Sequence, residues 1–179
     1  MYTDTHRGGR ENTTPKLLKI LYKMQKKEKM RRMTAEDKPY VLEMMRTFYR
    51  SDAVMTNGSE EIFTSDIEEC ISDSPYMEGF VFPDEEGEIK GYAMIAHSYS
   101  TEFGRHCIWI EDLYLQSELR GKGLASEFFD YLKTQYPDSI NRLEAEAENE
   151  RAIKAYSKNG FKEMPYLEMI RFNDTKGSR

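Results

Sequence analysis

The stretch LRGKGLASEFFDYL, residues 119–132, constrains the fold more than any other part of the chain. Its glycines, at 121 and 123, stand between RHCIWIEDLYLQ (residues 105–116) and an apolar repeat with helical spacing. β-Branched and aromatic residues favour a strand. The spacing of the repeat is typical of the buried stripe of a helix, here formed by Leu124, Phe128, Tyr131 and Leu132. The sequence therefore predicts a strand, a glycine-rich loop and a helix, in that order.

The predicted loop is suited to binding an anion. Glycine allows backbone torsions that are closed to other residues, and the first N–H groups of a helix have no partner within the helix. Together with the helix dipole they favour a group such as a pyrophosphate, and Arg120 and Lys122 add positive charge. The P-loop pattern is absent, and Ser126 stands where the dinucleotide-binding fingerprint needs its third glycine. On these residues alone, an ordinary glycine-rich turn is the alternative.

The rest of the chain predicts an α/β domain with a mixed sheet. Thr34 and Asp37 resemble a capping box before one amphipathic helix, and Ser59 can cap a second helix. RLEAEAE, residues 142–148, contains poor strand formers, but its strict alternation favours a strand over a helix. In the second helix we expect inward-facing Ile62, Ile67, Cys70 and Ile71. The predicted order is β-α-α-β-β-β-α-β-α-β, with strands at 29–34, 78–83, 88–99, 105–116, 142–148 and 161–172 and helices at 35–50, 60–73, 124–132 and 149–159.

Charge divides the chain into unequal parts. Residues 1–32 carry ten Lys and Arg against three Asp and Glu, whereas residues 33–179 carry 16 basic and 29 acidic residues. An acidic body repels nucleic acid and attracts cations. We expect a partly disordered basic extension at 1–29, a folded domain at 30–173 and a tail at 174–179. The extension could be a membrane-surface or nucleic-acid arm, an organelle presequence, or a dispensable segment upstream of the true start.

The compartment follows from what the sequence lacks. No apolar run is long enough to span a membrane, and no stretch near the start resembles a secretory signal. The two cysteines form no metal-ligand pair, and the three histidines are scattered, so no metal site is expected. We expect a cytoplasmic protein that binds neither a membrane nor nucleic acid.

From about residue 30 to 172 the chain resembles the GNAT superfamily of N-acetyltransferases. Arg120, Gly123 and Ala125 match its [QR]-x-x-G-x-[GA] hallmark. Asn149 follows at a suitable distance, and residues 152–161 match A-x-x-x-Y-x-x-x-G-F. The resemblance implies a mostly antiparallel central sheet flanked by helices, acetyl-CoA as co-substrate, and transfer of an acetyl group to a primary amine without a covalent enzyme intermediate. Self-association is common in this family, and PYLEMIRF could pair with a second copy to form a homodimer.

The resemblance also implies roles for individual residues. The strand ending in Leu113, Tyr114 and Leu115 would pair with the pantetheine arm through its backbone. Asn149 would contact the CoA chain, although a plain N-cap is the alternative, and Tyr156 would lie near the sulfur as the general acid, although a core aromatic is the alternative. The diphosphate would be held by Arg120, Gly121, Lys122, Gly123, Leu124, Ala125 and Ser126.

The residues expected to face the acceptor amine are two adjacent acids, Glu111 and Asp112, which interrupt an apolar strand. Neighbouring strand residues face opposite sides, so at most one reaches a cleft unless a bulge intervenes. A carboxylate in apolar surroundings has a raised pKa and suits a general base, for which we take Glu111; a solvated or ion-paired residue is the alternative. IEDLYL is also similar to the spermidine/spermine acetyltransferase branch, which favours a small cationic amine. We expect further acids to rim this site, with a plain solvated helix face as the alternative: Glu60, Glu61, Asp66, Glu68 and Glu69.

Three other functions stay open on the sequence. Protein N-termini, lysine side chains or aminoglycosides could be the acceptor, since acceptor loops vary on a shared fold. A catalytically weak acetyl-CoA sensor would keep the same loop. A nucleic-acid-binding protein would use the basic extension, and its binding would depend strongly on salt.

Overall fold

The computed structural model describes residues 28–51 and 53–173, and its centre is a five-stranded sheet in the order β1-β2-β3-β4-β5. The strands are β1 (Arg31–Arg32), β2 (Met77–Pro83), β3 (Ile89–Ser100), β4 (Arg105–Leu115) and β5 (Ile140–Leu143). Neighbours from β1 to β4 are antiparallel, whereas β5 runs parallel to β4. The predicted α/β class with a mixed, mostly antiparallel sheet is confirmed.

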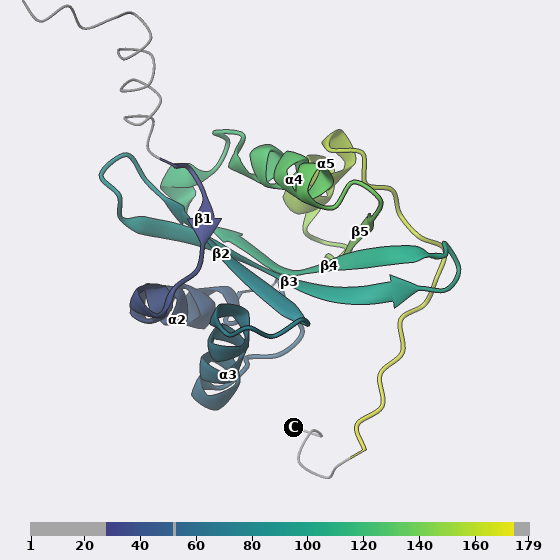
Figure 1. Ribbon diagram of the computed structural model, residues 1–179, viewed down its shortest axis with the longest axis horizontal. Helices are drawn as coiled ribbons and strands as arrows, with labels where there is room; N and C mark the ends of the chain where they lie inside the picture. Colours follow the sequence, from purple (N-terminus) through teal and green to yellow (C-terminus); the bar gives the residue numbers. More distant parts are fainter. Residues whose placement is uncertain (1–27, 52, 174–179) are drawn as a thin grey trace, which may run out of the picture.

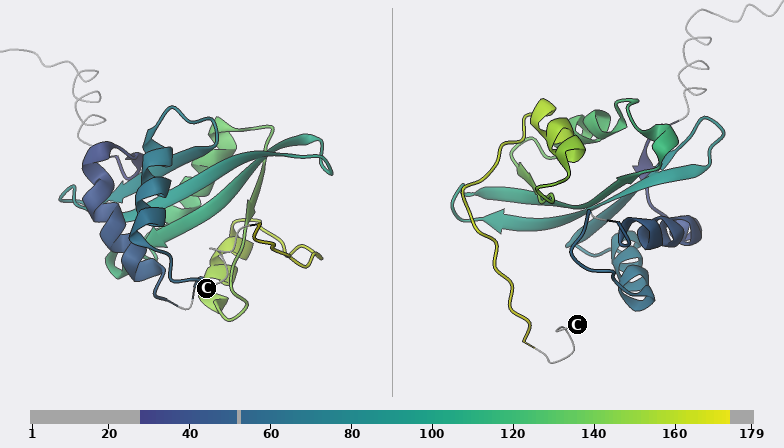
Figure 2. Two further views of the ribbon diagram at one scale, coloured as in Figure 1. Left: turned by 90° about the horizontal axis from the view of Figure 1, so that it is seen from below. Right: turned by 180° about the vertical axis from the view of Figure 1, so that it is seen from behind.

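Helices cover both faces of this sheet (Figure 1). In that view α2 (Lys38–Phe48) and α3 (Glu60–Ile71) lie below the sheet, and α4 (Leu124–Gln135) and α5 (Glu150–Lys158) lie above it. Figure 2 shows the same three layers from two other sides. Two short 3-10 turns, η1 (Ala35–Asp37) and η2 (Ser117–Leu119), precede α2 and α4.

The central strands are buried on both faces, so the core has two halves. Phe80 and Phe82 of β2 point toward α4, where the ring of Phe128 lies 5.5 and 5.9 Å from theirs. Val81, between them, packs instead with α2 and α3. This alternation follows from the pleat of a strand. One half of the core therefore lies on each face of the sheet, each covered by one pair of helices.

The predicted caps begin the first two helices. The backbone N–H of Thr34 donates to Asp37 Oδ2 at 2.9 Å, and Arg31 donates two further bonds to Asp37 at 2.6 and 2.7 Å. Ser59 Oγ accepts from the N–H of Ile62 at 3.3 Å. The inward face of α3 differs from the prediction in one residue, because the side chain of Ile62 is exposed and Phe63 is buried instead. Phe63, Ile67 and Cys70 then follow one another at helical spacing.

Two predicted strands differ from the structure. The alternating run at 142–148 is a strand only as far as Leu143, where its poor strand formers begin and β5 ends. The final strand predicted at 161–172 is wrong as stated, because this segment is extended but pairs with no strand of the described part of the chain. Extended backbone becomes a sheet strand only when a partner edge lies at hydrogen-bonding distance.

Predictions for the basic extension concern residues that the structure does not describe, apart from its last two residues, and the tail at 174–179 is not described either. Across residues 28–51 and 53–173, no helix is both long and apolar enough to cross a membrane.

Candidate active site

The glycine loop before α4 has the backbone that the sequence predicts. Gly121 and Gly123 have φ values of 76° and 83°, in the left-handed region that other residues rarely adopt. Gly123 is the N-cap of α4, and a Cβ placed at either glycine would meet nothing within 4 Å. The glycines therefore serve the backbone conformation, and the space beside them is open to a ligand.

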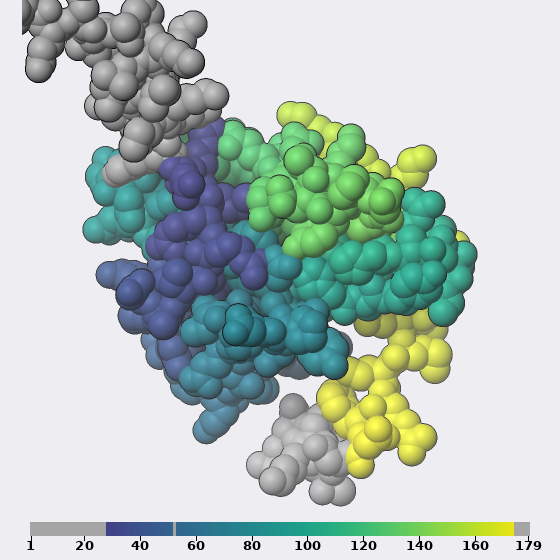
Figure 3. All heavy atoms as spheres, in the orientation of Figure 1, coloured from purple at the N-terminus to yellow at the C-terminus, as the bar shows by residue number. Residues whose placement is uncertain are grey.

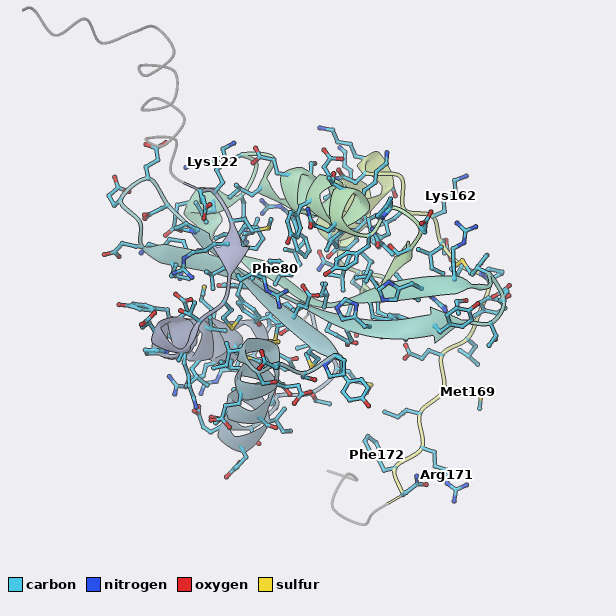
Figure 4. The ribbon with its side chains drawn as sticks, in the orientation of Figure 1. Phe80, Lys122, Lys162, Met169, Arg171 and Phe172 are labelled. Carbon is cyan, nitrogen blue, oxygen red and sulfur yellow. The ribbon has the colours of Figure 1, made fainter. Side chains whose placement is uncertain are left out.

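Charge and free amides meet at this loop. The first N–H groups of α4, at Leu124, Ala125 and Ser126, precede the first helical hydrogen bond, in which Glu127 N donates to the carbonyl of Gly123. Lys122 is exposed on the loop, at the outer edge of the molecule (Figure 4). This arrangement can hold an anion.

Arg120 joins the loop to the end of β4. Its Nε donates to the carbonyl of Leu115 at 2.6 Å, and its guanidinium lies 5.9 Å from the centre of the Tyr114 ring. The loop is therefore fixed against the last residues of the strand.

Strand β4 opens away from β5 halfway along its length. The two strands pair from Cys107–Ile140 to Ile110–Leu143, whereas β4 continues to Leu115. The N–H of Gln116 donates to the carbonyl of Lys90 in β3, and the carbonyl of Leu115 faces the other way, toward Arg120. Because backbone groups alternate along a strand, those of Leu113 and Leu115 face the open edge. This edge can receive an extended chain as an added strand.

A bulge in β4 brings both predicted acids to one place. Met94 of β3 pairs with Asp112 and Ile95 pairs with Ile110, so Glu111 has no partner residue in β3. An extra residue in one strand redirects its neighbours. Glu111 and Asp112 consequently line the same cavity of about 200 Å³, together with Tyr49, Asp66, Met77 and Met94.

Asp112 is the buried acid of this cavity, with 4% of its surface exposed. The hydroxyl groups of Tyr92 and Tyr49 donate to its two oxygens at 2.9 and 3.3 Å. The pKa of Asp112 is raised from 3.8 to about 6. Burial raises it most, the hydrogen bonds from Tyr92 and Tyr49 lower it, and the charges of Asp66 and Glu111 raise it. Burial and the Asp112 charge also raise the pKa values of both tyrosines, so they stay protonated as donors.

Glu111 and Asp66 complete an acidic wall. Burial first, and then the charges of Asp66 and Glu168, raise the pKa of Glu111, while burial alone raises that of Asp66. The six lining residues include three carboxyl groups and no cationic side chain. Such a cavity attracts a cation and leaves Glu111, which is exposed at its mouth, free to accept a proton.

Of the five acids predicted to rim the acceptor site, only Asp66 lines the cavity. Glu60 pairs with Arg46 at 2.6 Å and Glu68 pairs with Lys38 at 2.6 Å, so both acids join α3 to α2. Glu69 accepts a hydrogen bond from Ser74, and Glu61 does not line the cavity. For these acids the plain surface interpretation fits better than an acceptor site.

Asn149 and Tyr156 lie on the side of the sheet that carries α4. Asn149 Oδ1 accepts from the N–H of Ala152 at 3.2 Å, so this residue is the N-cap of α5. The Tyr156 ring lies 6.2 Å from that of Phe129 and 6.0 Å from that of Phe161. Burial raises the pKa of Tyr156, which keeps its hydroxyl protonated. Tyr156 is not among the six residues that line the acidic cavity.

Sequence reasoning missed Tyr49 and Tyr92, the two donors to Asp112. The signal was an aspartate in an apolar strand, because a buried carboxylate needs hydrogen-bond donors. Neither donor could be chosen from twelve tyrosines, since one lies at the end of α2 and the other in β3.

Comparison with known proteins agrees with this geometry. The model of the acetyltransferase (GNAT) family matches residues 40–161. No curated protein sequence matches the chain.

Several solved structures share the fold. One described as a possible acetyltransferase from Clostridium difficile 630 has 18% identity and a TM-score of 0.66, over 81% of this chain and 96% of that one. AAC(6')-Iy in complex with the bisubstrate analog CoA-S-monomethyl-acetylneamine has 15% identity and a TM-score of 0.66, over 81% and 97%. Ribosomal-protein-alanine N-acetyltransferase from Brucella melitensis biovar Abortus 2308 has 16% identity and a TM-score of 0.62, over 80% and 98%. The family match covers most of the domain, and the chain belongs to the GNAT family of acetyltransferases.

Proposed function

We propose that this protein transfers an acetyl group from acetyl-CoA to the primary amine of a small cationic acceptor. GNAT acetyltransferases use acetyl-CoA as co-substrate. The observation that carries the acceptor class is the cavity beside the bulge of β4, with three carboxyl groups and no cation in its lining.

The residues present fit acetyl-CoA. The left-handed glycines leave open space before α4, and the first amides of this helix are free to bind the diphosphate. The open edge of β4 offers the backbone of Leu113 and Leu115 to the pantetheine arm. In the bound state, acetyl-CoA supplies the thioester whose acetyl carbon moves from sulfur to the amine nitrogen.

Glu111 is the better candidate for the general base. Asp112 is buried and already accepts two tyrosine hydrogen bonds, whereas Glu111 is exposed at the cavity mouth. Glu111 would take the proton that the ammonium group must lose before the nitrogen can attack.

Tyr156 is the candidate general acid. Its raised pKa keeps the hydroxyl protonated, so it can donate a proton to the departing sulfur. Asp66 and Asp112 would hold the positive charge of the acceptor in the cavity.

Release of free thiol from acetyl-CoA across a panel of amines tests this function. The panel contains spermidine, putrescine, an aminoglycoside, a lysine-bearing peptide, a peptide with a free N-terminus and a neutral amine. We expect turnover with the small di- and polyamines and the lowest kcat/KM with the neutral amine. Equal rates for all amines would contradict the role of the acidic cavity.

Tyr156→Phe separates an enzyme from an acetyl-CoA sensor. In an enzyme this change should lower kcat by at least 10-fold while acetyl-CoA still binds, because only proton donation is lost. Binding of acetyl-CoA without turnover of any amine, in both the parent and the variant, would favour a sensor.

A further inference from the structure

The two tyrosines that donate to Asp112 differ in what else they can reach. Tyr92 lies in β3, is completely buried and does not line the acidic cavity. Tyr49 is the C-cap of α2 and lines the cavity, and its ring is held 5.4 Å from that of Phe48 and 4.9 Å from that of Phe63. Its hydrogen bond to Asp112 is the longer of the two, at 3.3 Å against 2.9 Å. Tyr49 is therefore the donor that a molecule in the cavity can touch.

The carboxylate fixes the direction of both hydrogen bonds. An ionised carboxyl group accepts hydrogen bonds and cannot donate them, so each tyrosine must donate its only hydroxyl proton to Asp112. A phenolic oxygen can still accept a hydrogen bond after it has donated its proton. Because Tyr49 lines the cavity, its oxygen is an acceptor for a molecule bound there.

The whole lining of the cavity offers hydrogen-bond acceptors. Its three carboxyl groups can only accept when they are ionised, and the proton of Tyr49 is engaged with Asp112. Met77 and Met94 add apolar surface with weakly accepting sulfur atoms. None of the six lining side chains therefore has a donor to offer. A molecule that satisfies this lining must carry its own N–H groups and a positive charge.

Glu111 and Asp112 lie at different depths of this cavity. Glu111 is exposed at its mouth, whereas Asp112 is 4% exposed. The layer of α2 and α3, which Figure 3 shows (purple to blue) packed below the sheet, covers this part of β4. Tyr49 ends α2 and Asp66 belongs to α3, so both come from that layer. The inner end of the cavity therefore combines Asp112 with Tyr49 and Asp66.

We propose that Tyr49 is a specificity-determining residue, which makes the cavity select acceptors with a second ammonium group that keeps its N–H groups. This inference rests on the proposed function, because it takes Glu111 at the mouth as the base for the nitrogen that is acetylated. The second ammonium group then lies deeper and donates to Asp112 Oδ1 and to the oxygen of Tyr49. Met77 and Met94 pack against the carbon chain between the two nitrogens.

Hydrogen bonding then distinguishes cations that charge alone cannot. Each methyl group on the second nitrogen removes one N–H donor and leaves the positive charge unchanged. An ammonium group with one methyl group still has a donor for each of the two oxygens, on Asp112 and on Tyr49. A second methyl group leaves one donor, so the bond to the neutral oxygen of Tyr49 is lost. A third methyl group leaves no donor for Asp112 either.

A series of acceptors with constant charge tests this inference. Putrescine and its N-methyl, N,N-dimethyl and N,N,N-trimethyl derivatives all keep a primary amine to acetylate and a second positive charge. We expect little change in kcat/KM with the first methyl group and a fall of about 10-fold with each of the next two, since each removes one hydrogen bond. In Tyr49→Phe the fall at the second methyl group should disappear, because the ring stays and only the acceptor is lost.

Two other tyrosines separate this role from a structural one. Tyr40→Phe is the matched control, because Tyr40 is 56% exposed on α2, and it should leave the whole series unchanged. Tyr92→Phe removes a hydrogen bond to Asp112 but no acceptor from the cavity. It should therefore weaken all four acceptors by a similar factor and keep both falls. If Tyr49→Phe behaves in the same way as Tyr92→Phe, its role is structural and the inference is wrong.

Calorimetry with CoA in place of acetyl-CoA measures the same series as dissociation constants, without any acetyl transfer. The same two falls in affinity, with the first of them absent in Tyr49→Phe, would support the inference even where no amine is acetylated. That combination would contradict the proposed function alone. An affinity that does not fall at the second methyl group, a fall there that survives Tyr49→Phe, or no binding of any of the four acceptors would overturn the role of Tyr49.

Discussion

The two halves of β4 lie in very different surroundings. Arg105–Ile110 pairs with β3 on one side and, from Cys107, with β5 on the other, and Ile108 in it is completely buried. From Glu111 onward the strand has a bulge, an open edge and two acids. The closed half is paired on both sides, whereas the open half has the backbone and carboxyl groups that the proposed binding and catalysis would use. The candidate site lies where β4 stops pairing with β5 and pairs with β3 alone.

Ile108→Ala tests the closed half and should have the largest effect. It removes buried volume between two paired strands, so the free energy of unfolding should fall by about 3 kcal/mol. Leu113→Ala, in the partly exposed open half, should cost clearly less. Chemical denaturation of both variants measures the difference, and equal losses would contradict a division of β4 into two halves.

Asp112→Asn tests the buried charge of the open half. The folded-state pKa of Asp112, about 6, lies above its ordinary value of 3.8. The folded state therefore holds its proton more tightly, and stability falls as pH rises from about 4 to 6, by on the order of 3 kcal/mol. Asp112→Asn should remove this decline.

The pH profile needs the parent protein beside the variant at each pH. His97 and His106 have pKa values lowered mainly by burial, so they destabilise the fold as pH falls below about 6.5, which opposes the Asp112 effect. Denaturant titrations from pH 4 to 7 give the comparison. Parallel profiles for parent and variant would show that Asp112 titrates normally.

Glu111→Gln tests the proton acceptor of the open half. We expect kcat to fall about 100-fold, which is the lower end for loss of a general base, with little change in the free energy of unfolding. Glu60→Gln is the control, because Glu60 pairs with Arg46 away from the cavity. An unchanged kcat in Glu111→Gln would exclude it as the base.

Gly123→Ala tests the loop that faces the open half, and we expect only a modest fall in the free energy of unfolding. Alanine in the left-handed region costs about 1 kcal/mol. Gly160→Ala is a matched control, since Gly160 has a φ of 88° and equally open surroundings, so it should cost as much. Only Gly123→Ala should weaken acetyl-CoA binding, measured by calorimetry. Equal affinities of the two variants for acetyl-CoA would show that the loop at Gly123 does not bind the co-substrate.

The sequence predicted the parts of this protein that short stretches specify. The left-handed Gly121 and Gly123, the cap at Ser59 and the order of elements through α5 all depend on residues within a few positions of each other. Local backbone preference and hydrophobic periodicity are enough for such features.

Only the tertiary structure decided which distant groups meet. The bulge at Glu111 places both acids in one cavity. Tyr49 and Tyr92, which belong to other elements, donate hydrogen bonds to Asp112. Glu60 and Glu68 pair with Arg46 and Lys38, so they do not form the expected rim. Residues 161–172 are extended as predicted, but they are not a strand, because no strand among residues 28–51 and 53–173 pairs with them. A residue's own preferences determine its backbone, whereas its partners depend on the three-dimensional arrangement of the whole chain.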